Sequence, residues 1–209
     1  MTKKERSASS LELIGGALCL DFANTVSTRQ EQERREYLNT YPELVAWSQH
    51  ARLLTEEMAE GLLRGADRRP DPTVAVLERA IALRETLYRV FSAVAQDRAP
   101  QSEDLAAVNA ALHEALSRLK IQPSAGGFEW SWIVHGNDLD RMLWPIIRSA
   151  AELLTSEELG RVRQCARNGC DWLFVDTSKN RSRRWCSMGM CGSRVKARRY
   201  YQRKKAHTN

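Results

Sequence analysis

Long apolar runs are missing from the 209 residues of this chain. No window approaches the eighteen or so consecutive apolar residues that a membrane-spanning helix needs. Lys3 and Arg6 precede an apolar stretch over 11–22, as in a secretory signal, but this stretch contains Glu12 and Asp21 and no small-residue cleavage site. We therefore expect a cytoplasmic protein without a membrane partner.

Acidic residues are almost missing from the C-terminal segment. From Arg161 onward, fourteen Lys and Arg stand against only Asp171 and Asp176, which gives a net charge of +12, whereas residues 1–160 carry a net charge of −6. The chain shows no internal repeat and no low-complexity segment. This asymmetry is typical of an acidic body joined to a basic module that binds nucleic acid or a membrane surface.

A catalytic constellation is missing as well. No phosphate-binding loop and no paired nucleophile and base can be located, and His50, His113 and His135 show no metal-ligand spacing. We therefore predict that the chain is not an enzyme.

A few polar residues interrupt the apolar N-terminal stretch. Asp21, Asn24 and Thr25 follow the pair Gly15-Gly16, whose backbone amides would be accessible. In one interpretation these three side chains line a small-ligand pocket. In the other, which we favour, they cap a helix and bond to nearby backbone groups, as short polar side chains readily do.

The body reads mainly as helix. Capping residues and apolar periodicity predict helices that begin near Thr40, Thr55, Asp71, Ser102 and Asp138. In the fourth of these, the apolar stripe is Leu105, Val108, Leu112, Leu116 and Leu119. Such amphipathic helices are typical of a bundle.

Two segments depart from this helical pattern. Phe128, Trp130, Trp132 and Val134 alternate with other residues, which predicts a short strand over 128–134. Residues 11–28 fit both a strand and a helix, and we favour a strand or turn over 11–16 followed by a helix.

Cysteine is confined to one cluster, apart from Cys19, which we expect to be a packed core thiol. The cluster reads Cys165-x4-Cys170-x15-Cys186-x4-Cys191. Two close cysteine pairs supply the four thiolates of a closed, tetrahedral zinc site. The alternative is two disulfides, but a cytosolic protein keeps its thiols reduced, so we predict one structural Zn²⁺ per chain.

The residues around these cysteines predict a small finger. Residues 171–176 suit a strand, 177–180 a turn, 183–185 a returning strand, and 192–205 a helix. The overall prediction is a mainly α protein: a helical N-terminal domain with a short β element, followed by a treble-clef-like or ribbon-like zinc finger built from a β-hairpin and a C-terminal helix.

The basic residues of this finger suit a nucleic-acid surface, since phosphates compensate the repulsion of like charges on one helix. The alternative is a solvated basic tail. The candidate contact residues are Arg181, Arg183, Arg184, Arg194, Lys196, Arg198, Arg199 and Arg203, with Lys204 and Lys205 beyond them.

These residues resemble a known family. The finger is similar to the CGNR-type zinc finger, whose naming tetrapeptide stands here as Cys191-Gly192-Ser193-Arg194, with Ser in place of Asn, and whose other matching stretch is 176–186. The body resembles the ABATE domain over Leu13–Thr25 and Asp138–Pro145. The resemblance implies a bacterial, stress-induced transcription regulator.

The combined prediction is a helical ABATE-like domain over 1–158, which senses an effector or dimerises, and a zinc finger over 159–209. Double-stranded DNA is the expected partner, with a homodimer and a small-molecule effector as further candidates. We expect chelation to unfold the finger and leave the body largely intact. Two alternatives are an RNA- or ribosome-associated zinc protein and a small-molecule enzyme that the finger merely localises.

Overall fold

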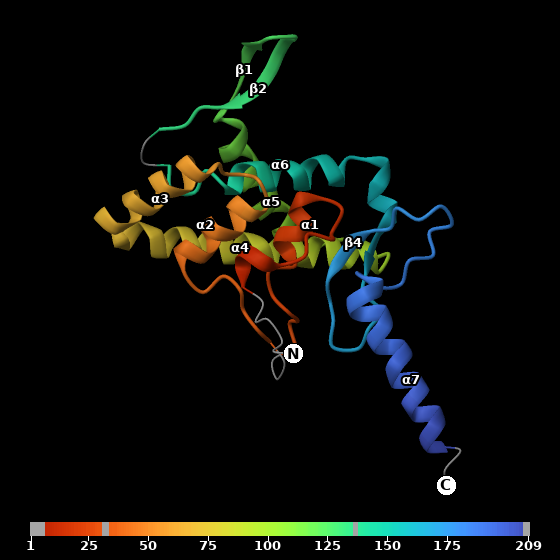
Figure 1. The fold of residues 1–209 in the computed structure, drawn as a ribbon. Coiled ribbons are helices and arrows are strands. Elements are labelled where there is room, and N and C mark those ends of the chain that lie inside the picture. Colours follow the sequence, from red (N-terminus) through yellow and green to blue (C-terminus); the bar gives the residue numbers. More distant parts are fainter. Residues whose placement is uncertain (1–6, 31–33, 136–137, 207–209) are drawn as a thin grey trace.

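The computed structural model describes residues 7–30, 34–135 and 138–206, and most of them are helical (Figure 1). The α-helices of this part are α1 (Leu18–Ala23), α2 (Tyr41–His50), α3 (Glu56–Arg68), α4 (Pro70–Ala95), α5 (Ser102–Leu116), α6 (Leu143–Leu154) and α7 (Ser193–Ala206). The strands are β1 (Leu119–Ser124), β2 (Gly127–Trp132), β3 (Val162–Gln164) and β4 (Leu173–Val175). They form two antiparallel pairs, β1 with β2 and β3 with β4. The mainly helical prediction with a short β element is confirmed.

Local sequence signals set the starts of the first helices. The Thr40 side chain accepts a hydrogen bond from the backbone N–H of Glu43, and Glu43 completes the capping box that begins α2. Thr55 in the same way accepts from the N–H of Met58 and begins α3. Of the described helices, none is long and apolar enough to cross a membrane.

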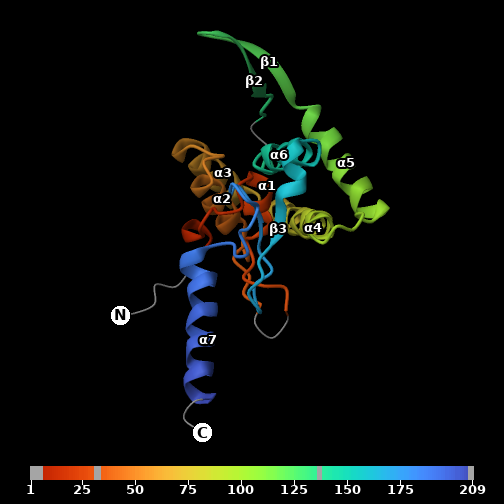
Figure 2. The same cartoon turned by 90° about the vertical axis from the view of Figure 1, so that its right-hand side faces the viewer.

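The core lies around α4, the long helix that runs through the body (Figures 1 and 2). Leu87 and Phe91 of α4 are fully buried, as is Ile146 of α6. The ring centroids of Phe22 in α1 and Trp47 in α2 lie 5.2 Å apart in the same core. The short helix α1 is therefore a central element, although its sequence fits two kinds of structure.

Helix α5 is packed less completely than its apolar stripe predicts. Val108 is buried, but Leu105 and Leu116 are exposed, and Leu119 belongs to β1 instead of the helix. Periodicity indicates which side of a helix is apolar but not whether another element covers it. Of the predicted stripe, the assignment of Leu119 to the helix is wrong, since that residue lies in β1.

The predicted strand over 128–134 is part of a hairpin. Strand β2 ends at Trp132, and it pairs with β1, in which Ile121 lies opposite Trp130 and Pro123 opposite Phe128. Strand β1 was not predicted, because Pro123 interrupts its sequence pattern. Proline is tolerated at a sheet edge, and both strands of this pair are edges.

A fully buried arginine anchors α4 to the loop before α2. The Arg84 side chain has no exposed surface; it donates to Glu36 at 2.6 Å and lies 2.8 Å from Glu85. Burial alone raises the pKa of Glu36, but the hydrogen bonds and charge of Arg84 outweigh it and lower that pKa overall. The ion pair is thus charged inside the fold.

Replacing Arg84 with Met should lower the free energy of unfolding by about 3–5 kcal/mol, because two carboxylates lose their buried counter-charge. Thermal or denaturant unfolding of the full chain measures the loss. The control is Arg79→Met on the same helix, whose exposed pair with Asp140 is worth about 0–1 kcal/mol. Equal losses in the two variants would contradict the assignment.

Candidate metal centre and nucleic-acid interface

The first cysteine pair lies in a turn between two short strands. Strand β3 pairs with β4 so that Val162 lies opposite Val175 and Gln164 opposite Leu173. Cys165 follows β3 directly, and its N–H donates to the Trp172 carbonyl at 2.9 Å. The chain then turns through Gly169, whose φ of +73° favours glycine, and reaches Cys170. The ladder therefore holds both cysteines on one knuckle.

The strand over 171–176 was predicted to pair with residues 183–185, but it pairs with an earlier strand instead. The predicted return strand over 183–185 is irregular, and β4 pairs with β3, which precedes the first cysteine. The cause is Asp176, whose carboxylate accepts hydrogen bonds from the backbone N–H groups of Ser178 and Arg183. This compact loop turns the chain away from β4.

The second cysteine pair begins the last helix. Cys186 is followed by a π-helical turn over Met188–Gly192, in which the N–H of Cys191 donates to the Ser187 carbonyl at 2.9 Å. A Cβ at Gly192 would lie 2.5 Å from the Met188 sulfur and 3.3 Å from the Trp185 ring, so a larger residue there would displace the exposed Met188 side chain. Helix α7 starts at the residue after Gly192, so the fourth cysteine stands at the helix entrance, as predicted.

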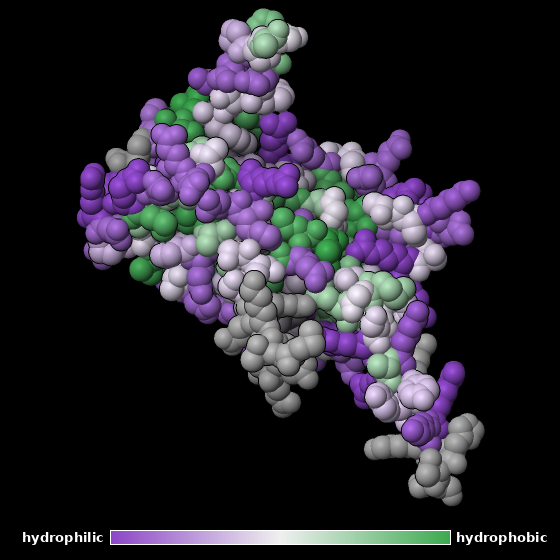
Figure 3. All heavy atoms as spheres, viewed as in Figure 1, coloured by the Kyte–Doolittle hydropathy of each residue, from purple (hydrophilic) through white to green (hydrophobic). Residues whose placement is uncertain are grey.

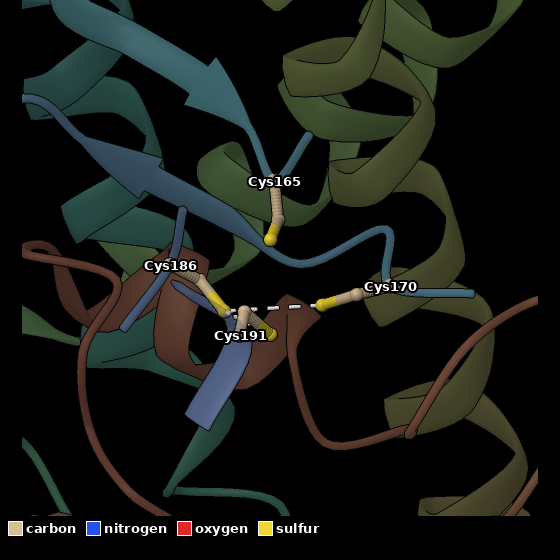
Figure 4. A group of neighbouring side chains, drawn as sticks. All are labelled: Cys165, Cys170, Cys186 and Cys191. Carbon is tan, nitrogen blue, oxygen red and sulfur yellow. Dashed lines mark hydrogen bonds between the residues drawn. The ribbon is translucent and has the colours of Figure 1, made fainter. Parts of the chain in front are cut away.

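The four thiols point toward one another (Figure 4). The Sγ atoms of Cys165, Cys170, Cys186 and Cys191 all lie within 4.8 Å of one another, and all four residues are buried. The Sγ–Sγ distances of 3.8 Å from Cys170 to Cys186 and 3.5 Å from Cys186 to Cys191 match the edge of a tetrahedron with Zn–S bonds of about 2.3 Å. All four are free cysteines, and the site fits one structural zinc.

An arginine that sequence analysis did not single out supports this site. The Arg167 Nε donates to the Cys191 Sγ at 3.1 Å, and its Nη2 donates to the Gly169 carbonyl at 2.8 Å. Hydrogen bonds from the other three thiols, together with Arg167, lower the pKa of Cys191. Because zinc binds the thiolate form, the hydrogen bond from Arg167 favours the metal-ligating state of Cys191.

The fifth cysteine is separate from this cluster. Cys19 is fully buried in α1, and burial raises its pKa to about 12. The prediction of a packed core thiol is confirmed.

Elemental analysis of the purified chain should find one zinc per polypeptide. Cys186→Ser removes a buried ligand and should reduce the bound zinc well below this ratio, whereas Cys19→Ala should keep the full amount. A wild-type chain with no metal, or a Cys186→Ser variant that keeps the full amount of zinc, would show that the cluster has another purpose.

The finger docks against the body through β4. The Asn24 side chain donates to the Leu173 carbonyl at 2.8 Å and accepts from the Leu173 N–H at 2.9 Å, so that its amide acts as an extra strand edge. Next to it, the N–H of Val175 donates to the Gly15 carbonyl at 2.8 Å. The Trp172 indole N–H donates to the Val26 carbonyl at 2.7 Å. Residues 173–175 are buried, so finger and body share one core.

An ionic contact strengthens the same junction. The Asp171 carboxylate accepts from the Arg29 backbone N–H at 2.5 Å and from the Thr28 hydroxyl at 3.3 Å. The Arg29 side chain continues to Glu85 of α4 at 2.7 Å and lies over the Tyr88 ring at 3.4 Å. Arg29 therefore connects the Asp171 carboxylate of the finger to Glu85, which in turn contacts the buried Arg84 of the body.

The candidate pocket residues are occupied by protein contacts. Asp21 accepts from the Gly15 N–H at 2.7 Å, and burial raises the pKa of its carboxyl to about 6. The Thr25 hydroxyl donates to the Phe22 carbonyl at 2.8 Å. With Asn24 bound to β4, all three side chains make contacts within the fold. Asp21 does not cap a helix as expected, because α1 has no side-chain cap and the Asp21 carboxylate binds the Gly15 N–H instead. Asn24 bonds to the distant strand β4 instead of to nearby backbone.

Asn24→Ala should lower the free energy of unfolding by about 2–3 kcal/mol, because it leaves a buried backbone N–H and carbonyl of Leu173 without partners. The measurement is denaturant unfolding of the zinc-loaded chain. Asn109→Ala on the exposed side of α5 is the matched control and should change stability little. A neutral Asn24 variant would mean that this contact does not hold the finger.

The basic residues of the finger have different surroundings. Arg181, Arg184, Arg194, Lys196, Arg198 and Arg203 are exposed. Arg183 is half-buried, lies 4.2 Å from the Phe174 ring centroid, and donates to the carbonyls of Ile14, Val175, Trp185 and Cys186. Its guanidinium therefore holds the finger together. The side chains of Arg199 and Lys205 lie outside the described part.

A groove joins the zinc knuckle to α7. It has a volume of about 370 Å³, and its lining residues are Ala166, Arg167, Asn168, Arg194, Val195, Arg198 and Gln202. Arg194, Arg198 and Gln202 follow one another at four-residue spacing, so they form one face of the helix. Sequence analysis identified Arg194 and Arg198 but missed the knuckle residues, whose position between the first two cysteines was the available signal.

Fold and metal centre together define a zinc-finger protein with a helical N-terminal domain. The family model of the ABATE domain, described as "Putative stress-induced transcription regulator", matches residues 16–157, and the CGNR zinc-finger model matches 161–204. The chain belongs to the ABATE family and carries a CGNR zinc finger. A comparison with curated proteins finds no match.

Proposed function

We propose that the chain is a transcription regulator that binds duplex DNA through α7 and the zinc knuckle. The observation that carries this proposal is the groove beside the metal centre, where Arg194 and Arg198 line an open space of about 370 Å³. Asn168 and Gln202 add amide groups to the same groove. Arginine and amide side chains are the usual donors to phosphates and base edges.

The direction of α7 supports the same proposal. The helix extends away from the body, so most of its sides are open (Figures 1 and 2). Closely spaced arginines and lysines destabilise an isolated helix, and neutralisation by phosphates removes this cost. The alternative, a solvated basic tail, does not account for the groove between the zinc knuckle and the start of α7.

The regulatory part of the proposal rests on the family and on the body. The family description names a stress-induced regulator of transcription, and the helical body is the part that would receive an effector or join two copies. The proposal assigns no catalytic role, because Asp21, Asn24 and Thr25 are used in the fold. Five free cysteines, with no disulfide among the described residues, suit a reducing cytoplasm.

Binding to duplex DNA should weaken steeply with salt. If about six of the exposed cations of the finger each neutralise one phosphate, log K should fall with log salt at a slope of about −5. Fluorescence anisotropy of a labelled duplex over a salt series measures this slope. The double variant Arg194→Ala/Arg198→Ala should reduce its magnitude by about two.

The matched control is Arg64→Ala/Arg68→Ala, which removes two exposed arginines at the same spacing from α3. It should leave the slope unchanged, since α3 lies in the body. Equal effects of the two double variants would mean that net charge alone governs binding. Competition with double-stranded RNA of the same length completes the test, and preference for the RNA would overturn the assignment to DNA in favour of an RNA-associated role.

A further inference from the structure

The β1–β2 hairpin is an amphipathic ribbon with one apolar face. Residues that lie opposite each other in an antiparallel pair share a face, so Ile121 lies beside Trp130 and Pro123 beside Phe128. The other face is polar and includes the hydrogen bond from Gln122 to Glu129.

Much of the apolar face has no cover among the residues that the structure describes. Phe128 is 79% exposed, Ile121 60% and Trp130 56%. The hairpin projects from the body at the end away from α7 (Figure 1), and hydrophobic side chains lie in the hairpin and beside its base (Figure 3). A two-stranded hairpin alone is marginally stable in water, and a contiguous exposed apolar surface marks an interaction site.

The base of the hairpin is fixed to its own body. The ring centroids of Trp132 and Trp144 lie 5.8 Å apart, and the Ile133 N–H donates to the Arg118 carbonyl at 2.6 Å. Arg118 in turn pairs with Asp138. These contacts hold the tip out from the body.

A trough lies on the body near this base, and it consists of two adjoining hollows of about 310 Å³ each, which share Arg79, Glu114, Asp140 and Trp144. One hollow carries several charged side chains, including Arg118 and Asp138, and the other is mainly apolar. The floor of the more apolar hollow is formed by α4, α5 and α6, with Ala82, Leu83, Ala107, Ala110, Ala111 and Ile147 among its lining residues. The small alanine side chains of α5 leave space for large side chains of a partner. Because no described element of the chain fills this space, α5 is only partly buried.

We propose that a second copy of this chain covers both features, so that the hairpin of each protomer lies in the α4–α5–α6 trough of its partner. A projecting arm with an apolar face and a trough with an apolar hollow are complementary features of one molecule. When each protomer places its arm in the trough of the other, the result is a closed, two-fold symmetric dimer.

The area fits a stable dimer. Covering three large apolar side chains and the facing trough in both copies removes about 1,000–1,500 Å² from water, near the lower part of the range for specific interfaces. The interface lies away from the finger, so both basic helices remain available for nucleic acid.

Sedimentation of the zinc-loaded full chain without nucleic acid tests the proposal. The expected mass is twice 23.8 kDa at micromolar concentration. Phe128→Ser/Trp130→Ser should raise the dissociation constant at least about 30-fold, as loss of central aromatic contacts does. Ala110→Arg, which places a charge in the trough, should have a similar effect, whereas the control Val74→Ser on the exposed side of α4 should dimerise normally.

A mixing experiment separates arm-in-trough exchange from contact between two arms. The arm variant keeps an intact trough, and the Ala110→Arg variant keeps an intact arm, so an equimolar mixture should recover dimers through one complete contact. A monomeric wild type overturns the proposal, and so does a mixture that stays monomeric. Binding of a monomeric wild type to phosphatidylcholine vesicles would assign the apolar face to a membrane instead. None of these results depends on DNA binding.

Discussion

The docking of strand β4 is the interaction on which the rest of the structure depends. On one side β4 continues the zinc knuckle through its ladder with β3, and on the other it bonds to Asn24 and Gly15 of the body. Its side chains lie in the common core. The metal therefore stabilises more than the finger, because loss of the knuckle removes a strand from the body's own packing, and the expectation that chelation leaves the body largely intact does not fit this arrangement.

This docking also determines where the basic surface points. Helix α7 starts at Ser193, two residues after Cys191, and the groove for nucleic acid lies between that helix and the knuckle that carries Cys165 and Cys170. The Arg167 side chain lines the groove while it donates to a zinc ligand. Metal, groove and body are thus parts of one assembly, and the proposed dimer arm lies at the opposite end of it (Figure 1).

Features with a local cause could be predicted from the sequence. The cysteine spacing indicated the ligands because zinc geometry limits the pattern, and the cap at Thr40 indicated the start of α2. Features that depend on distant partners could not. Asn24 bonds to a strand 149 residues further along the chain. Strand β3 is only three residues long, which is too short for a clear sequence pattern. The exposure of Leu105 and Leu116 in α5 depends on whether another element packs against them, which the periodicity of the helix does not show.

Hydrogen exchange of the zinc-loaded and the chelated chain tests most directly whether finger and body form one unit. The amides of α1 and β4 should be protected together when zinc is bound, and chelation should release both, while α3, which lies farther from the finger, changes less. If α1 keeps its full protection after chelation while residues 165–191 exchange freely, the finger is an independent module and the account of a shared core is contradicted.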